Sequence, residues 1–153
     1  MRAMKHRNRM APGLLFTVLV FVFVTGPAVA NDRPTESKAK LAIELNALDQ
    51  RGKACRLSFL VSNKTGVALQ ALAFELVLFD KSQRIVSLVA AEAGALPKGK
   101  TRVKQFDIAE RDCATIGKLL LNDITQCTGG ALAPQTCLEQ VSVGSRAAVP
   151  LVY

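Results

Sequence analysis

The chain has 153 residues and a formal net charge of +8, with 20 Lys or Arg against 12 Asp or Glu. Residues 1–30 hold four of the cations, no anion and the only histidine, His6, so residues 31–153 carry a net charge of +4. The remainder is only mildly basic, and it has no histidine to act as a general base or to complete a zinc site. Its length corresponds to one ordinary domain, with no need for a metal or cofactor to stabilise the fold.

Residues 1–30 have the three parts of a secretory signal peptide. A basic stretch at 2–9 precedes an apolar run at 14–24, and small residues, Ala28 and Ala30, follow at the positions that signal peptidase reads. As a helix the apolar run spans about 16 Å, about half the thickness of a bilayer core. An uncleaved membrane anchor is the alternative. We expect cleavage after Ala30, no stable membrane span afterwards, and a periplasmic or secreted protein.

Four cysteines follow the predicted cleavage site: Cys55, Cys113, Cys127 and Cys137. An even number of cysteines in an exported chain predicts two disulfides, and three pairings are possible. The spacing C-x-x-C does not occur, so a redox or zinc motif has no support. Residues 128–136 form a Gly- and Pro-containing loop that a local bridge between Cys127 and Cys137 would close. This favours Cys55 with Cys113 as the second, long-range pair.

The rest of the chain predicts an all-β fold, an antiparallel β-sandwich over residues 39–153 that follows a flexible leader at 31–38. Apolar segments alternate with turn residues about every ten positions, as in sandwiches and barrels. The strands are expected at 41–46, 55–62, 69–79, 84–91, 101–108, 116–124 and 141–152. Good helix formers leave a helix as the alternative for 41–46. The predicted core contains the large apolar members of these strands, Phe59, Phe74, Leu76, Leu78 and Phe106.

Three segments carry a resemblance to a known family: Cys55 through Asn63, Phe74 through Asp80, and the turn Leu96-Pro-Lys-Gly before Phe106. They resemble the immunoglobulin-like, FxLYD-type β-sandwich of small exported bacterial proteins. Segments 102–107 and 120–123, near paired cysteines, are similar to a set of uncharacterised secreted proteins, some of which are labelled by a twin-arginine signal. Here Arg7 and Arg9 are not adjacent. The resemblance implies a disulfide-stapled immunoglobulin-like fold and an exported location, and it brings no catalytic residues.

Four cations recur at every second position: Lys98, Lys100, Arg102 and Lys104. In an extended chain their side chains project from one face at intervals of about 6.8 Å. The plainer interpretation is a solvent-facing strand whose cations prevent edge pairing. The sharper hypothesis is a binding site for an acidic protein or another anionic envelope component. Nucleic acid is not expected, because no aromatic residues are interleaved with the cations for base stacking.

Catalysis is a distant third interpretation, because without a histidine it would need a Ser–Lys dyad, and the candidates Ser58, Ser62 and Ser87 lie within expected strands and not on loops. Asp107, Glu110 and Asp112 are interpreted as a solvated loop because Arg111 lies among them and the spacing is not that of a calcium loop. The sequence Asn-Lys-Thr from Asn63 is interpreted as a turn, although it fits the glycosylation pattern. We therefore expect a non-enzymatic exported envelope protein that acts as an interaction or binding module. The alternative is a structural or stress-protective envelope component without a defined ligand.

Overall fold

The computed structural model describes residues 40–153. The predicted signal peptide (1–30), the leader (31–38) and the start of the domain at residue 39 lie outside the described residues. Within residues 40–153, no helix is long and apolar enough to cross a membrane.

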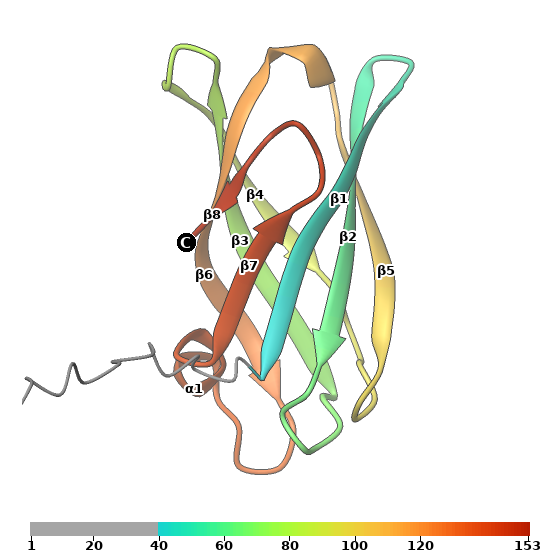
Figure 1. Ribbon diagram of the computed structural model, residues 1–153, viewed down its shortest axis with the longest axis vertical. Coiled ribbons are helices and arrows are strands. Elements are labelled where there is room, and N and C mark those ends of the chain that lie inside the picture. Colours follow the sequence, from blue (N-terminus) through green and yellow to red (C-terminus); the bar gives the residue numbers. More distant parts are fainter. Residues whose placement is uncertain (1–39) are drawn as a thin grey trace, which may run out of the picture. The chain divides into compact units, whose positions relative to one another are not determined.

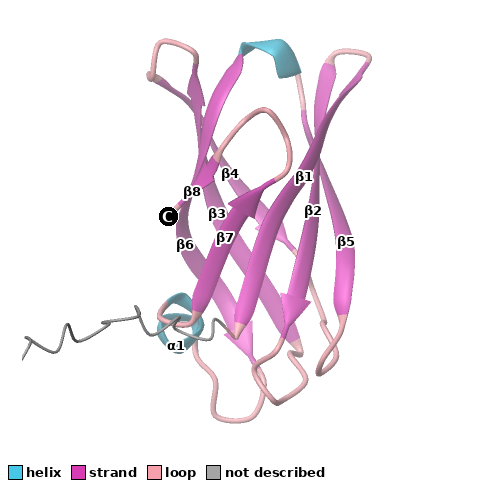
Figure 2. Cartoon of the chain, viewed as in Figure 1, coloured by secondary structure: helices cyan, strands magenta, loops and turns pink. Residues whose placement is uncertain are grey.

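Strands make up most of the fold, and the helices are short (Figures 1 and 2). In chain order the elements are β1 (Leu41–Arg51), β2 (Ala54–Asn63), β3 (Ala71–Asp80), β4 (Ile85–Glu92), β5 (Thr101–Ile108), η1 (Cys113–Thr115), β6 (Ile116–Thr128), α1 (Pro134–Leu138), β7 (Val141–Ser145) and β8 (Leu151–Val152). Six of the seven strands expected from the sequence are present, and the seventh, at 141–152, is divided into β7 and β8. The helical alternative for residues 41–46 is wrong, because these residues lie in β1 with Leu41, Ile43 and Leu45 fully buried on one face.

The strands form two four-stranded sheets, ordered β5-β2-β1-β7 and β4-β3-β6-β8. The expectation of a purely antiparallel sandwich needs correction, because β7 pairs parallel to β1 and β8 pairs parallel to β6. The single strand expected at 141–152 is divided by a bend at 146–150, which includes Pro150. The final segment thereby contributes one edge strand to each sheet (Figure 1).

The core lies between the two sheets and draws aromatic side chains from both. Phe59 of β2, Phe74 of β3 and Phe106 of β5 meet with ring centroids 5.8 to 6.0 Å apart, a range in which edge-to-face contacts are favourable. Leu76 and Leu78 are fully buried beside them. The predicted core is confirmed, although Phe106 is only half-buried. Its strand, β5, is at the edge of its sheet, so one side of the ring has less cover.

Several local features were not expected, among them the register shifts of β3 against β4 and β6. Asn46 forms a β-bulge in β1, because the pairing with β2 shifts between Leu45 and Ala47. The loop between Cys127 and Cys137 contains α1, which begins at Pro134. Proline is favoured in the first turn of a helix because its missing N–H has no partner there anyway. A five-residue helix is too short to show a periodic apolar pattern in the sequence.

Candidate functional site

Two disulfides fix the framework, and they have the pairing that the sequence favoured. Cys55 is bonded to Cys113 across 58 residues, and Cys127 is bonded to Cys137 across 10. The first joins the start of β2 to η1, and the second joins the end of β6 to α1. By the loop-entropy argument, a closed loop of this longer size stabilises the fold by about 4 kcal/mol. No free cysteine remains within residues 40–153.

The four predicted cations do not form one evenly spaced stripe. Lys98 lies in a turn where Gly99 has a positive φ of 70°, and Lys100 precedes β5. Only Arg102 and Lys104 lie within the strand itself. The expected interval of 6.8 Å along an extended chain therefore does not extend to Lys98, because the backbone turns at Gly99.

Lys104 differs from the other three cations in its exposure. Like Arg102, which pairs with the buried Val61, it lies on the core-facing side of β5, opposite the buried Phe59. Unlike the exposed Arg102 it is half-buried, which corrects the expectation that it faces solvent. Because β5 is an edge strand, the long side chain can pass the rim of the sheet to reach water. A charge that points inward at a sheet edge opposes pairing with another strand. For Lys104, the structure favours the plainer interpretation.

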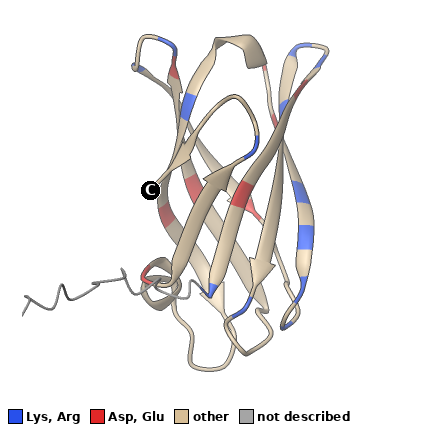
Figure 3. Cartoon of the chain, in the orientation of Figure 1, with Lys and Arg blue, Asp and Glu red and all other residues tan. Residues whose placement is uncertain are grey.

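The structure brings two further cations to the same end of the sandwich. The backbone N–H of Lys64 donates to the carbonyl of Lys40 at 2.7 Å, and that of Asn63 donates to the carbonyl of Lys100 at 2.9 Å. We call the resulting surface the basic end. It comprises the exposed residues Lys40, Lys64, Lys98, Lys100 and Arg102. Figure 3 shows Lys and Arg gathered on β5 and on the loops at this end. Within residues 40–153, none of the five has a carboxylate oxygen within 4.0 Å.

A single buried side chain, Asn63, holds the basic end together. Its Nδ2 donates to the carbonyls of Val67, Leu96 and Pro97, and its Oδ1 accepts from the N–H and the hydroxyl of Thr65. Asn63 is fully buried. Its bonds tie the loop after β2 to the loop before β5, which fixes Lys64 beside Lys98 and Lys100. The turn expected at residues 63–66 is thus built by the asparagine that the glycosylation pattern singled out.

The acidic residues near Cys113 do not form a joint site, since each has a local partner. Arg56 donates to both carboxylate oxygens of Asp107 at 2.7 and 2.8 Å. This hydrogen-bonded pair lowers the pKa of Asp107 and raises the pKa of Arg56. Glu110 lies 3.8 Å from the Lys53 ammonium, and Asp112 accepts the N–H of Ala114 at the start of η1. No cluster of His, Cys, Asp and Glu side chains within residues 40–153 could hold a metal ion.

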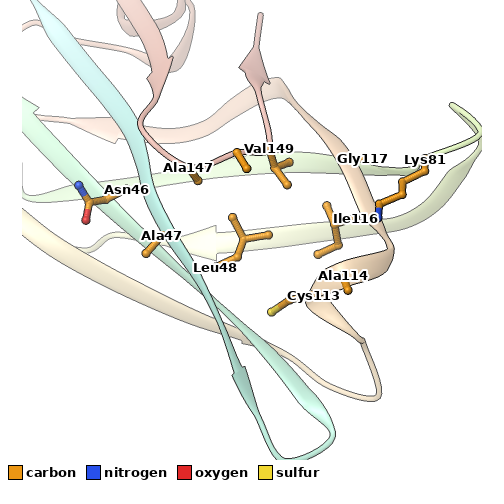
Figure 4. Close-up of a pocket in the computed structure, with 11 residues that line it drawn as sticks. Asn46, Ala47, Leu48, Lys81, Cys113, Ala114, Ile116, Gly117, Ala147 and Val149 are labelled. Atoms are coloured by element: carbon orange, nitrogen blue, oxygen red, sulfur yellow. The ribbon is translucent and has the colours of Figure 1, made fainter.

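A pocket of about 630 Å³ lies where the β1 bulge, the start of β6 and the loop between β7 and β8 meet (Figure 4). It is lined by Asn46, Ala47, Leu48, Lys81, Cys113, Ala114, Ile116, Gly117, Ala147, Ala148 and Val149. The wall is mostly apolar, and Cys113 is held in a disulfide. Nothing in the sequence signalled this pocket, because its lining comes from distant segments that only the fold brings together.

Comparison with known proteins gives a similarity of fold and no similarity of sequence that identifies a family. No protein-family model matches the chain, and no curated protein sequence matches it. The structure is similar to that of IrmA from Escherichia coli, with a TM-score of 0.50 and 14% sequence identity. The match covers 67% of this chain and 89% of the IrmA chain. At this identity the likeness concerns the arrangement of strands alone.

Proposed function

We propose that the chain is an exported, non-enzymatic envelope protein of the immunoglobulin-like class that binds an acidic protein partner through its basic end. The observation that carries this proposal is the set of five exposed cations that lie together without carboxylate partners. Exposed charges of one sign attract a complementary surface and accelerate encounter. The two disulfides support an oxidising compartment, where such bonds persist.

The arrangement of the cations also supports binding. Asn63 fixes the two loops that carry Lys64, Lys98 and Lys100, so these side chains project from a fixed backbone. A preformed site loses less conformational entropy on binding than a mobile one.

Affinity capture from an envelope extract tests the proposal. The bait is the protein recovered from the envelope, and its intact mass shows whether residues 1–30 have been removed. We expect a specific acidic partner, held at low salt and released at moderate salt, because exposed charges are screened over about 8 Å at physiological ionic strength. The variant Lys98→Gln/Lys100→Gln should lose this partner.

The matched control is Arg51→Gln/Lys53→Gln, which removes the same charge from exposed positions at the β1–β2 turn. It should retain the partner. Equal capture by the wild type and both variants would show that the basic end only keeps the sheet edge soluble. Binding to vesicles of anionic lipid in place of a protein would reassign the partner. A clean blank with all baits would favour a structural envelope component.

A further inference from the structure

A continuous row of apolar side chains crosses the outer face of the β4-β3-β6-β8 sheet. Residues directly opposite each other in paired strands share a face of the sheet. Val77 of β3 pairs with Leu88 of β4 on one side and with Leu120 of β6 on the other, and Leu120 pairs with Val152 of β8. We call these four residues the outer row: Leu88, Val77, Leu120 and Val152.

The outer row is separate from the core. Its neighbours in β3, Leu76 and Leu78, are fully buried between the sheets, so Val77 points to the other side. Ile85 and Phe79 form a second opposed pair beside the row. Ile85 is 67% exposed, Leu88 is 60% exposed and Val152 is 36% exposed, whereas Val77, in the middle of the row, is only 6% exposed. A contiguous apolar surface of this kind marks a contact site more often than scattered single residues do.

Charges of opposite sign lie on the two sides of the outer row. On one side, Glu75 of β3 faces Asp123 of β6. On the other side, Lys118 of β6 pairs with Phe79, and its ammonium lies 4.3 Å from the centre of that ring. The strand β6 therefore carries an acid on one side of the row and a base on the other, and Figure 3 shows the two colours at separate heights of this strand.

We propose that the outer row is the interface of a homodimer whose two-fold axis runs along the row, across the strands. Rotation about this axis places the row of one copy on the same row of the other. It also exchanges the two sides, so that Lys118 of each copy lies opposite Asp123 of its partner. In such an isologous interface each ion pair forms twice. This proposal is independent of the basic end, which lies elsewhere on the molecule.

The charge pattern favours this arrangement over the one with the axis parallel to the strands. A two-fold axis parallel to the strands would keep each side opposite itself and would bring Asp123 against Glu75 of the partner. Like charges that face each other across an interface repel and disfavour that geometry. A second copy fits the face because the acidic and basic sides match each other, whereas a partner of uniform charge would be repelled on one side.

Charge reversal tests the proposal, with sedimentation equilibrium as the measurement of the dimer dissociation constant. Lys118→Glu alone and Asp123→Lys alone should each weaken the dimer at least about tenfold, since each creates two like-charged contacts. The two variants mixed together should form a heterodimer with both pairs restored. The double variant Lys118→Glu/Asp123→Lys should regain the dimer. Circular dichroism and thermal melting of each variant check that the fold is retained.

Recovery of the dimer in the mixture of the two variants distinguishes this interface from nonspecific association. Nonspecific association does not depend on which copy carries which charge, so it would not recover on mixing. Leu120→Ser, in the row itself, should also weaken the dimer about tenfold through the loss of apolar contact. A wild-type protein that stays monomeric up to millimolar concentration would overturn the proposal. A dimer that ignores both reversals, or one that Leu120→Ser leaves intact, would overturn it as well.

Discussion

The side chains on the two outer faces of the sandwich differ in the partners that they have within the chain. On the β5-β2-β1-β7 sheet, polar residues bond to one another across strands. Arg56 pairs with Asp107, Gln105 donates to Ser58 at 3.0 Å, and the hydroxyls of Ser62 and Thr101 are 2.7 Å apart. One apolar pair, Leu60 with Val103, interrupts this ladder. The opposite face also has a cross-strand bond, from Asn122 to Glu75 at 2.6 Å, but its centre is the outer row, whose apolar members have no such partners.

The difference indicates what each face is built to meet. A face whose polar groups are already paired has little to gain from a partner, because any new contact must replace bonds that exist. An apolar face gains free energy when water is removed from it. The β4-β3-β6-β8 sheet therefore offers the stronger driving force for association, whereas the basic end offers steering and salt dependence.

The largest expected effect compares the two sides of that sheet. Leu76→Ala, in the core, should lower the free energy of unfolding by about 3 kcal/mol, because it leaves a cavity between the sheets. Leu88→Ala removes the same atoms from the outer row and should cost about 0.5 kcal/mol or less in the monomer. Urea denaturation at low protein concentration measures both. Equal costs would mean that the outer row belongs to the core.

The next effect compares a buried polar residue with a polar residue on the outer face of the β5-β2-β1-β7 sheet, which we call the paired face. Asn63→Ala leaves the carbonyl of Leu96 and the groups around it without their donor, so we expect a loss of about 2–3 kcal/mol. Ser62→Ala, one residue earlier, removes an exposed hydroxyl bond and should cost about 0.5 kcal/mol. Thermal unfolding of both variants checks the difference. A small effect at Asn63 would show that the two loops hold their positions without it.

Much of the fold could be predicted from the sequence because two signals are local. Alternating apolar residues such as Cys55, Leu57 and Phe59 define which face of a strand is buried. Turn residues define where each strand ends. The parallel pairing of β7 with β1 and of β8 with β6 could not be predicted. It depends on the chain crossing from one sheet to the other at 146–150, which leaves no periodic pattern in the sequence.

The basic end was only partly predicted, because contacts between distant segments also leave no local pattern in the sequence. Spacing along the chain identified Lys98, Lys100 and Arg102, but Lys40 and Lys64 join them through backbone bonds between distant segments. The half-buried position of Lys104 depends on its register opposite Phe59, which spacing alone does not give. The outer row was missed in the same way, since its four residues come from four strands.

The smallest expected effect concerns the ion pair on the paired face and depends on pH. The hydrogen bonds from Arg56 lower the pKa of Asp107 below its ordinary value of 3.8, so the unfolded chain binds a proton more readily than the folded one. The stabilisation from this carboxylate is therefore present above pH 3.8 and is lost as the pH falls through the lower pKa of the folded state.

Asp80 contributes to the pH dependence of stability with the same sign, because the hydrogen bond from the backbone N–H of Arg84 lowers the pKa of its carboxyl group. The wild type alone therefore cannot separate the two carboxylates. The difference in unfolding midpoint between the wild type and Asp107→Asn removes the contribution of Asp80, and it should be positive at neutral pH and vanish in acid. Glu110→Gln serves as the control, since its only ion pair in the described chain is an exposed contact of 3.8 Å. A difference for Asp107→Asn that persists unchanged into acid would show that its bonds to Arg56 do not stabilise the paired face through charge.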